Sequence, residues 1–146
     1  MATFRGSFQH SIDHKGRVSI PARFRRVLSV ESNDTLVVLR GLDACVWLYP
    51  LEEFQRFEER LRARPMGDEA SRRFQRMLLV DSRDETLDAQ GRVAIPPRLI
   101  AHANLEKDVI VIGLLDHMEI WNPNLFDQYL KSSNRTYEDI AGELLL

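Results

Sequence analysis

Apolar and polar positions along the chain predict a mixed structure of short strands and helices. From Phe4 to Ile12 the apolar residues fall loosely on alternate positions, which is typical of a strand with one buried face. Residues 36–39 are continuously apolar, and this indicates a strand without a solvent-exposed face. Another apolar strand is expected over residues 45–49. Helical spacing of apolar residues predicts helices over residues 21–28 and 50–63, and a third beginning at an Asp68 cap.

The second half of the chain shows the same order of patterns. A short strand is expected at 92–95, and a helix that begins with Pro96 is expected to end near Ala103. Residues 109–112 correspond to the earlier apolar run, and residues 115–123 correspond to residues 42–50. A last helix is predicted to end near Lys131. The following residues are polar as far as the three final leucines, and we expect residues 132–146 to be loosely ordered.

Two segments of eleven residues explain this parallel. Residues 13–23 and residues 88–98 lie 75 positions apart and are identical at seven of eleven positions. In both segments an Asp and a Gly predict a tight turn, because Asp can bond to its own backbone and Gly accepts a positive φ. An agreement this dense indicates an internal duplication, in which each copy has the order β-β-α-β-β followed by a helix.

A unit of about 45–50 residues buries too little surface to be stable alone. We therefore expect the two copies to pack on each other about a pseudo-twofold axis and to form one small closed sheet. The fold class is α+β and mainly β. The expected organisation is repeat one over 7–54, a helical linker over 55–82, repeat two over 83–126, and a C-terminal helix and tail over 127–146.

Bulk composition fits a soluble globular protein, with 44% hydrophobic and 29% charged residues among 146. No apolar run approaches the ~18–20 residues that a membrane-spanning helix needs, and the N-terminus lacks an apolar signal core. Cys45 is the only cysteine, so the sequence has neither a disulfide framework nor a cysteine metal cage. The predicted location is cytoplasmic, without a membrane partner.

The net charge of −2 argues against a nucleic-acid ligand, but the distribution of charge argues for one. Residues 1–30 contain six basic residues and one acidic residue, so they carry +5 and the remainder carries −7. Charge segregated in this way indicates an electrostatic face. Part of the basic cluster could instead be a solvated helix surface.

Several motifs together resemble the MraZ family, the tandem-repeat branch of the AbrB/MazE-like superfamily. The resemblance covers about residues 4–130. The residues that carry it are Phe4-Arg5-Gly6, the two D-x-x-x-R segments at Asp13–Arg17 and Asp88–Arg92, Gly41-Leu42-Asp43 with Cys45, Trp47-Leu48-Tyr49-Pro50, and Glu119-Ile120-Trp121.

The resemblance implies a double-split β-barrel of the swapped-hairpin AbrB-like kind, with capping helices and half of the barrel from each repeat. It implies a sequence-specific transcriptional regulator that binds double-stranded DNA and is associated with the nucleoid. The expected targets are a bacterial cell-division and cell-wall gene cluster and the protein's own promoter. It also implies a ring-shaped homo-oligomer that engages short direct repeats.

The second repeat departs from the first in charge. It has Ala89-Gln90 where the first has His14-Lys15. Residues 7–54 contain six basic and six acidic residues, whereas residues 80–126 contain four and eight. We infer that repeat one faces DNA and that repeat two is mainly structural.

Arg17 is the leading candidate for DNA contact, because a guanidinium can bind phosphate or a guanine edge with two hydrogen bonds. Lys15 and Arg5 are expected to flank it. Arg23 and Arg26, with Arg25, could neutralise phosphates or could belong to a solvated helix face. The remaining motif residues are expected to brace the two turns: Asp13, Gly16, Asp88, Gly91 and Arg92.

Other classes of site find little support. His10, Asp13 and His14 lack a fourth metal ligand, and neither a G-x-S-x-G elbow nor a glycine-rich phosphate loop occurs. We therefore expect no enzyme activity, no metal, no cofactor and no small-molecule substrate. Trp47, Tyr49 and Trp121 are expected in the core. Two alternative functions stay open: an AbrB/MazE-like antitoxin, and a structural ring-forming protein without a role on DNA.

Overall fold

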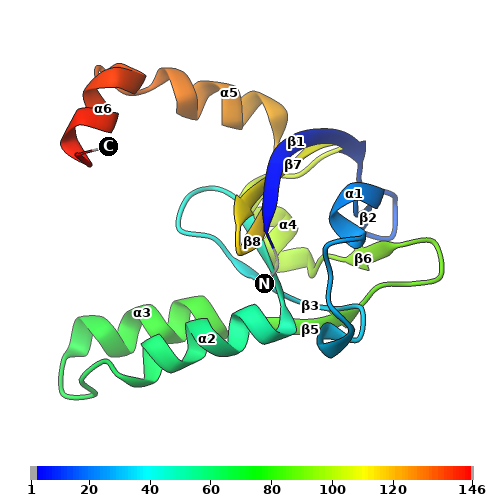
Figure 1. Cartoon of the computed structure of the whole chain (residues 1–146), viewed down its shortest axis with the longest axis horizontal. Helices are drawn as coiled ribbons and strands as arrows, with labels where there is room; N and C mark the ends of the chain where they lie inside the picture. Colours follow the sequence, from blue (N-terminus) through cyan, green and yellow to red (C-terminus); the bar gives the residue numbers. More distant parts are fainter. Residues whose placement is uncertain (1–2, 146) are drawn as a thin grey trace.

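The computed structural model describes residues 3–145 and has the duplicated order of elements that the sequence predicts (Figure 1). The first half contains β1 (Phe4–Ser11), β2 (Arg17–Ser19), α1 (Ala22–Arg25), the 3-10 turn η1 (Val30–Ser32), β3 (Thr35–Arg40), β4 (Val46–Pro50) and α2 (Leu51–Arg62). The second half contains α3 (Glu69–Leu79), β5 (Arg83–Thr86), β6 (Arg92–Ala94), α4 (Pro97–Ala103), β7 (Asp108–Leu115), β8 (His117–Trp121), α5 (Pro123–Lys131) and α6 (Tyr137–Glu143).

Strands from the two repeats are interleaved in one antiparallel sheet. The strand order is β1-β7-β8-β4-β3-β5, so three of the five neighbouring pairs join one repeat to the other. The short strands β2 and β6 pair with each other and form a second sheet, with Val18 opposite Val93, and Val18 also forms an isolated antiparallel bridge with Ile12. The two repeats therefore share their hydrogen bonds, as expected for copies that cannot fold separately.

The expected closed sheet is not formed by the described residues. The larger sheet is open, with β1 and β5 at its edges, and the β2–β6 pair is a separate ladder. A physical reason lies in the length of β2 and β6. Each begins directly after a tight turn and ends just before an Ile-Pro pair, so its three residues form one full ladder, and β2 adds only the single bridge from Val18 to Ile12. The fold is thus α+β with mainly antiparallel strands, and the ladders do not close into a barrel.

Two apolar clusters lie on the two faces of the larger sheet. Strand β3 contributes to both, because Leu36 and Val38 belong to one cluster while Val37 and Leu39 belong to the other. This alternation confirms that residues 36–39 form a strand without a wet face. The first cluster also holds Phe24 from α1, and the second holds residues predicted to be core: Trp47, Tyr49 and Trp121, which are 7%, 3% and 2% exposed.

Two helical predictions need correction. Helix α1 ends at Arg25 instead of near Leu28, because the next backbone N–H groups of Val27 and Leu28 bond three residues back and tighten the chain. The C-terminal segment is not loosely ordered throughout, since it contains α6. The Thr136 side chain accepts from the Asp139 N–H while Asp139 bonds back to the Thr136 N–H, which is a capping box.

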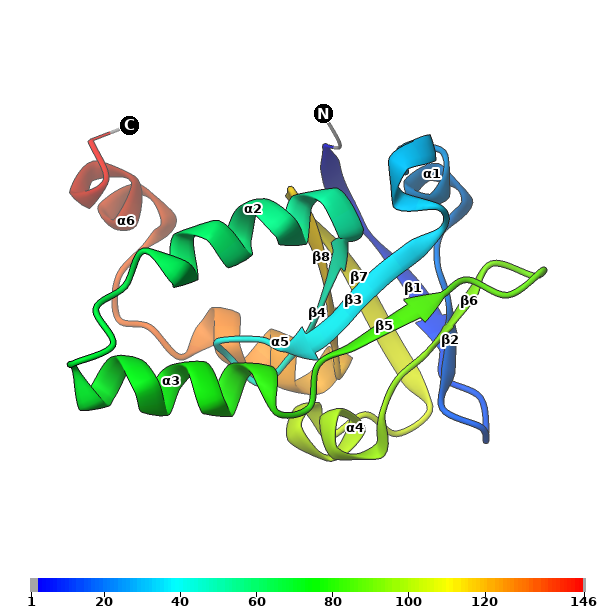
Figure 2. The same ribbon diagram turned by 90° about the horizontal axis from the view of Figure 1, so that it is seen from below.

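The molecule has two different ends (Figures 1 and 2). The β1–β2 turn, the β5–β6 turn and α1 lie at one end, on the right of both views. The α2–α3 hairpin and an arm formed by α5 and α6 project at the opposite end. Within residues 3–145, none of the helices has the length and apolar character needed to cross a membrane.

Candidate nucleic-acid interface

The first turn is a compact structure built around one carboxylate. Asp13 Oδ1 accepts hydrogen bonds from the backbone N–H groups of Lys15 and Arg17, both at 2.9 Å. Asp13 Oδ2 accepts from Arg17 Nε at 2.8 Å. Gly16 has φ +77°, and a Cβ there would lie 3.2 Å from Ile100 Cδ1, so the turn requires glycine. The D-x-x-x-R spacing therefore lets one aspartate both fix the backbone of the turn and orient the side chain of Arg17.

The second turn repeats this geometry. Asp88 Oδ1 accepts from the N–H groups of Gln90 and Arg92 at 2.9 Å, and Asp88 Oδ2 accepts from Arg92 Nε at 2.8 Å. Gly91 has φ +76°. Both Asp–Arg pairs are thus turn braces. Because Nε is the nitrogen used, the terminal Nη groups of each arginine can still donate to a ligand.

The two turns lie at opposite ends of the short antiparallel β2–β6 ladder, and the side chain of Arg92 reaches from one toward the other. Arg92 Nη1 lies 3.8 Å from Asp13 Oδ2, so a charged group of one repeat approaches the brace of the other. The side chains of Arg17 and Arg92 are 29% and 26% exposed. Arg17, Asp13, Arg92 and Asp88 therefore form a row of alternating charge. All four side chains are partly buried and partly exposed to solvent.

The structure brings some predicted cations together and separates others. Lys15 is exposed in the same turn as Arg17, and Arg23 and Arg26 are exposed on and just after α1 at the same end. Arg5 is exposed but lies opposite Leu114 at the start of β1, about 25 Å along that strand from the turn at ~3.3 Å per residue. Arg5 therefore does not flank Arg17.

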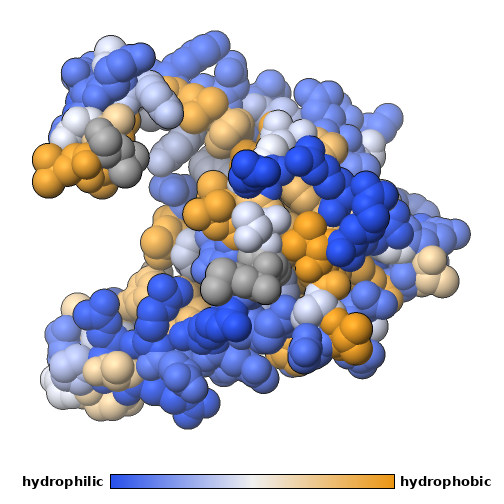
Figure 3. Space-filling view, viewed as in Figure 1, coloured by the Kyte–Doolittle hydropathy of each residue, from blue (hydrophilic) through white to orange (hydrophobic). Residues whose placement is uncertain are grey.

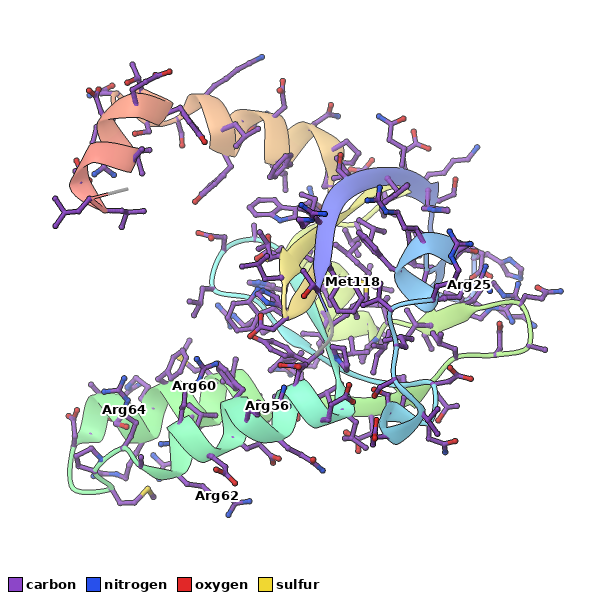
Figure 4. The ribbon with its side chains drawn as sticks, in the orientation of Figure 1. Arg25, Arg56, Arg60, Arg62, Arg64 and Met118 are labelled. Carbon is purple, nitrogen blue, oxygen red and sulfur yellow. The ribbon has the colours of Figure 1, made fainter. Side chains whose placement is uncertain are left out.

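Arg25 occupies a position that its grouping with Arg23 and Arg26 does not predict. It extends from α1 in repeat one onto the turn of repeat two, where a Cβ on Gly91 would lie 2.6 Å from its Nη1 (Figure 4). Its Nε donates to the Ile20 carbonyl at 3.1 Å. The residue 75 positions later, Ile100, covers Gly16 in the same way. Each turn is therefore supported by the helix of the other repeat.

This exchange corrects the electrostatic argument from the sequence. Arg25 belongs to repeat one in the sequence, but its guanidinium lies on the turn of repeat two. The second turn is therefore less poor in cations than the count indicated. The first turn still has His14 and Lys15 exposed beside Arg17, and the second has Ala89 and Gln90 in the matching places.

The described residues offer no group of three or more His, Cys, Asp or Glu side chains that could hold a metal ion. Both oxygens of Asp13 are occupied by the turn. The arrangement at this end of the molecule consists of guanidinium, ammonium and imidazole groups on rigid turns. Such groups can donate hydrogen bonds to anionic oxygens and to base edges.

The brace predicts a specific pH dependence. The hydrogen bond from the Arg17 backbone N–H, with help from the Arg17 side chain, lowers the pKa of Asp13 to about 2. A lowered folded-state pKa means that the brace contributes fully above the usual value of 3.8 and is lost as pH falls through about 2. Carboxyl NMR titration is expected to show this low midpoint, whereas Asp13→Ala, which removes the acceptor, is expected to increase amide exchange at Lys15. A midpoint near 4 would contradict the brace.

Comparison with known proteins identifies the family. A family model described as "MraZ protein, putative antitoxin-like" matches twice, at residues 3–77 and 79–145. A transcriptional regulator MraZ from Natranaerobius thermophilus is 39% identical over 142 residues, which cover 97% of this chain and 96% of the relative. The protein of the same name from Caldanaerobacter subterraneus subsp. tengcongensis is 40% identical over 139 residues, which cover 95% and 94%. The chain, with its duplicated and braced turns, belongs to the MraZ family.

Proposed function

We propose that this protein is a sequence-specific DNA-binding transcriptional regulator. The names of its relatives support regulation of transcription. The observation that carries a DNA ligand is the pair of adjacent, braced turns that hold Arg17 and Arg92, with Lys15 exposed beside them. Rigid turns suit recognition, because they fix arginine side chains before binding and reduce the entropy lost on contact.

DNA would be read by these turns and short strands, since the two turns flank the three-residue β2–β6 ladder, one at each end. Lys15, Arg23 and Arg26 would contact phosphates, while Arg17 would contact phosphate or a guanine edge. Arg25 would add a cation at the second turn. Asp13 and Asp88 would not contact DNA themselves and would act as positioning residues.

The proposed targets are the promoter of a cell-division and cell-wall gene cluster and the protein's own promoter, so the protein would act in the cytoplasm at the nucleoid. Three or four phosphate contacts per copy give weak binding to one site. A ring-shaped oligomer that engages several short direct repeats would convert this weak binding into high avidity.

Binding to the protein's own upstream DNA tests the proposal. Fluorescence anisotropy is expected to show tight binding to a fragment with two direct repeats and about 100-fold weaker binding when one repeat is scrambled, because effective concentration is lost. The logarithm of affinity for one site should fall with the logarithm of salt at a slope of about −3. Equal affinity for one and two repeats, without salt dependence, would contradict the proposal, and absence of binding to either fragment would favour a structural protein.

An antitoxin is the alternative within the superfamily, and the family description includes the word antitoxin-like. Antitoxins of this kind bind a toxin through an extended tail, whereas residues 137–143 of this chain form a capped helix. Co-purification of a stoichiometric small protein from the native host would favour the antitoxin.

A further inference from the structure

The hairpin at the end opposite the turns contains an apolar groove. It lies between α2, α3 and the loop after β3, and has a volume of about 610 Å³. Phe57 and Leu61 line it from α2, Phe74 from α3 and Leu42 from the loop. Leu42 and Phe74 are 68% and 39% exposed, and α3 buries only Leu78. The groove is therefore an uncovered continuation of the second apolar cluster.

The C-terminal arm presents a second uncovered apolar surface. Neither α5 nor α6 contains a buried residue. Among residues 3–145, fifteen large apolar side chains are exposed, and twelve of them lie on the arm or on the hairpin and its neighbouring loop. Apolar surface concentrated in this way marks an interaction site. The twelve are Leu42, Met66, Phe74, Met77, Leu79, Val80, Tyr129, Leu130, Tyr137, Ile140, Leu144 and Leu145.

The two surfaces have opposite charge. Residues 56–80 contain seven arginines and four acidic residues, whereas α6 contains three acidic residues and no basic one. Arg60 on α2 and Arg64, in the loop directly after that helix, line the groove (Figure 4). An acidic amphipathic helix is therefore complementary to this groove in both apolar character and charge.

The arm is held away from the hairpin of its own chain. The Trp121 ring packs against Phe126 and Tyr129, with centroids 5.2 and 5.3 Å apart. Asn122 caps α5 and donates to the Asn104 carbonyl at 2.9 Å. These contacts fix the direction of α5, and Figure 3 shows a hollow between the arm and the hairpin. The apolar side chains of α6 are therefore left uncovered by the chain that carries them.

We propose that the α5–α6 arm of one copy binds in the α2–α3 groove of a second copy. The contact is heterologous, since two different surfaces meet, and copies joined in this way form a ring when the rotation closes. The inference rests on the proposed self-assembly and identifies the surfaces that produce it. It also places the assembly contacts at the end of the molecule remote from the DNA-binding turns.

Two complementary variants test this docking in the absence of DNA. The arm variant carries Ile140→Asp with Leu144→Asp, and the groove variant carries Phe74→Asp. Val30→Asp is the matched control, because Val30 is 94% exposed in η1, outside both surfaces. Light scattering after size-exclusion chromatography is expected to give multi-chain masses for the wild type and control, and the mass of one chain for each test variant. Circular dichroism checks that all variants are folded.

Mixing the two test variants provides the decisive measurement. The intact groove of the arm variant can accept the intact arm of the groove variant, so an equimolar mixture is expected to form a two-chain species and nothing larger. Test variants that keep the wild-type mass, or single chains that fail to pair on mixing, would overturn the proposal. A wild type with the mass of one chain at all concentrations would also overturn it.

Single-site DNA binding separates this proposal from the proposed function. The single-chain variants are expected to bind one DNA repeat within about threefold of the affinity of one wild-type subunit, because the turns are unchanged. Loss of assembly with retained single-site binding supports both proposals. Assembly through the arm without any DNA binding would leave the docking intact and overturn only the DNA-binding function.

Discussion

Replacing Arg17 by alanine is expected to weaken binding to a two-repeat promoter fragment by about 100-fold or more. One bidentate arginine contact contributes about 1–3 kcal/mol, and a two-repeat fragment loses the contact in at least two copies. Each ~1.4 kcal/mol corresponds to a factor of ten. Because the Arg17 side chain is 29% exposed and lies outside both apolar clusters, the substitution removes a donor without removing a core side chain.

The matched control is Arg62→Ala, which makes the same change in net charge on α2, at the opposite end of the molecule (Figure 4). It is expected to leave affinity within about twofold. Arg92→Ala is expected to cost less than Arg17→Ala, because the second turn lacks the lysine of the first. Equal losses for Arg17→Ala and Arg92→Ala would show that both turns contact DNA alike, and light scattering should show unchanged assembly for every variant.

Separating the two repeats is expected to abolish the fold. Fragments 1–66 and 67–146, divided in the exposed Pro65–Gly67 loop, should each lack cooperative unfolding, because three of the five pairs in the larger sheet and the whole β2–β6 ladder join the repeats. Neither fragment can close the shared core alone. Circular dichroism and thermal melts provide the measurement.

An equimolar mixture of the fragments is expected to recover the strand signal and one cooperative transition. Cutting the intact, folded protein in the same loop should leave the fold in place, since that loop carries no strand pairing. A cooperative melt from either fragment alone would mean that a repeat is an independent unit, and would contradict the interleaved sheet as the source of stability.

Most elements were predictable because their signals are local. The Asp68 cap, the Pro96-led start of α4 and the end of α5 at Lys131 lie where the sequence places them. The capping box before α6 is equally local, and the Thr-x-x-Asp spacing at Thr136 would have revealed that helix. The sequence contains no signal for the early end of α1. Only the hydrogen bonds made after Arg25 show that the chain forms a tight turn there and not a longer helix.

Some features of the candidate site were predictable from local sequence, and others were not. The brace between Asp13 and Arg17 depends on four residues of spacing, so the motif predicts it. The separation of Arg5 from the turn follows from the length of β1, which the alternating pattern already indicated. The place of Arg25 could not be read from the chain, because it depends on how one repeat lies across the other.

The support of each turn by the opposite repeat has a consequence for divergence after duplication. A larger side chain at Ile100 would press on Gly16, and a change at Arg25 would alter the surroundings of Gly91. Substitutions at these positions in one repeat are thus constrained by the residue that they contact in the other repeat. Attempts to alter the glycine of either turn will need compensating changes in the other half of the same gene, at Arg25 for Gly91 or at Ile100 for Gly16.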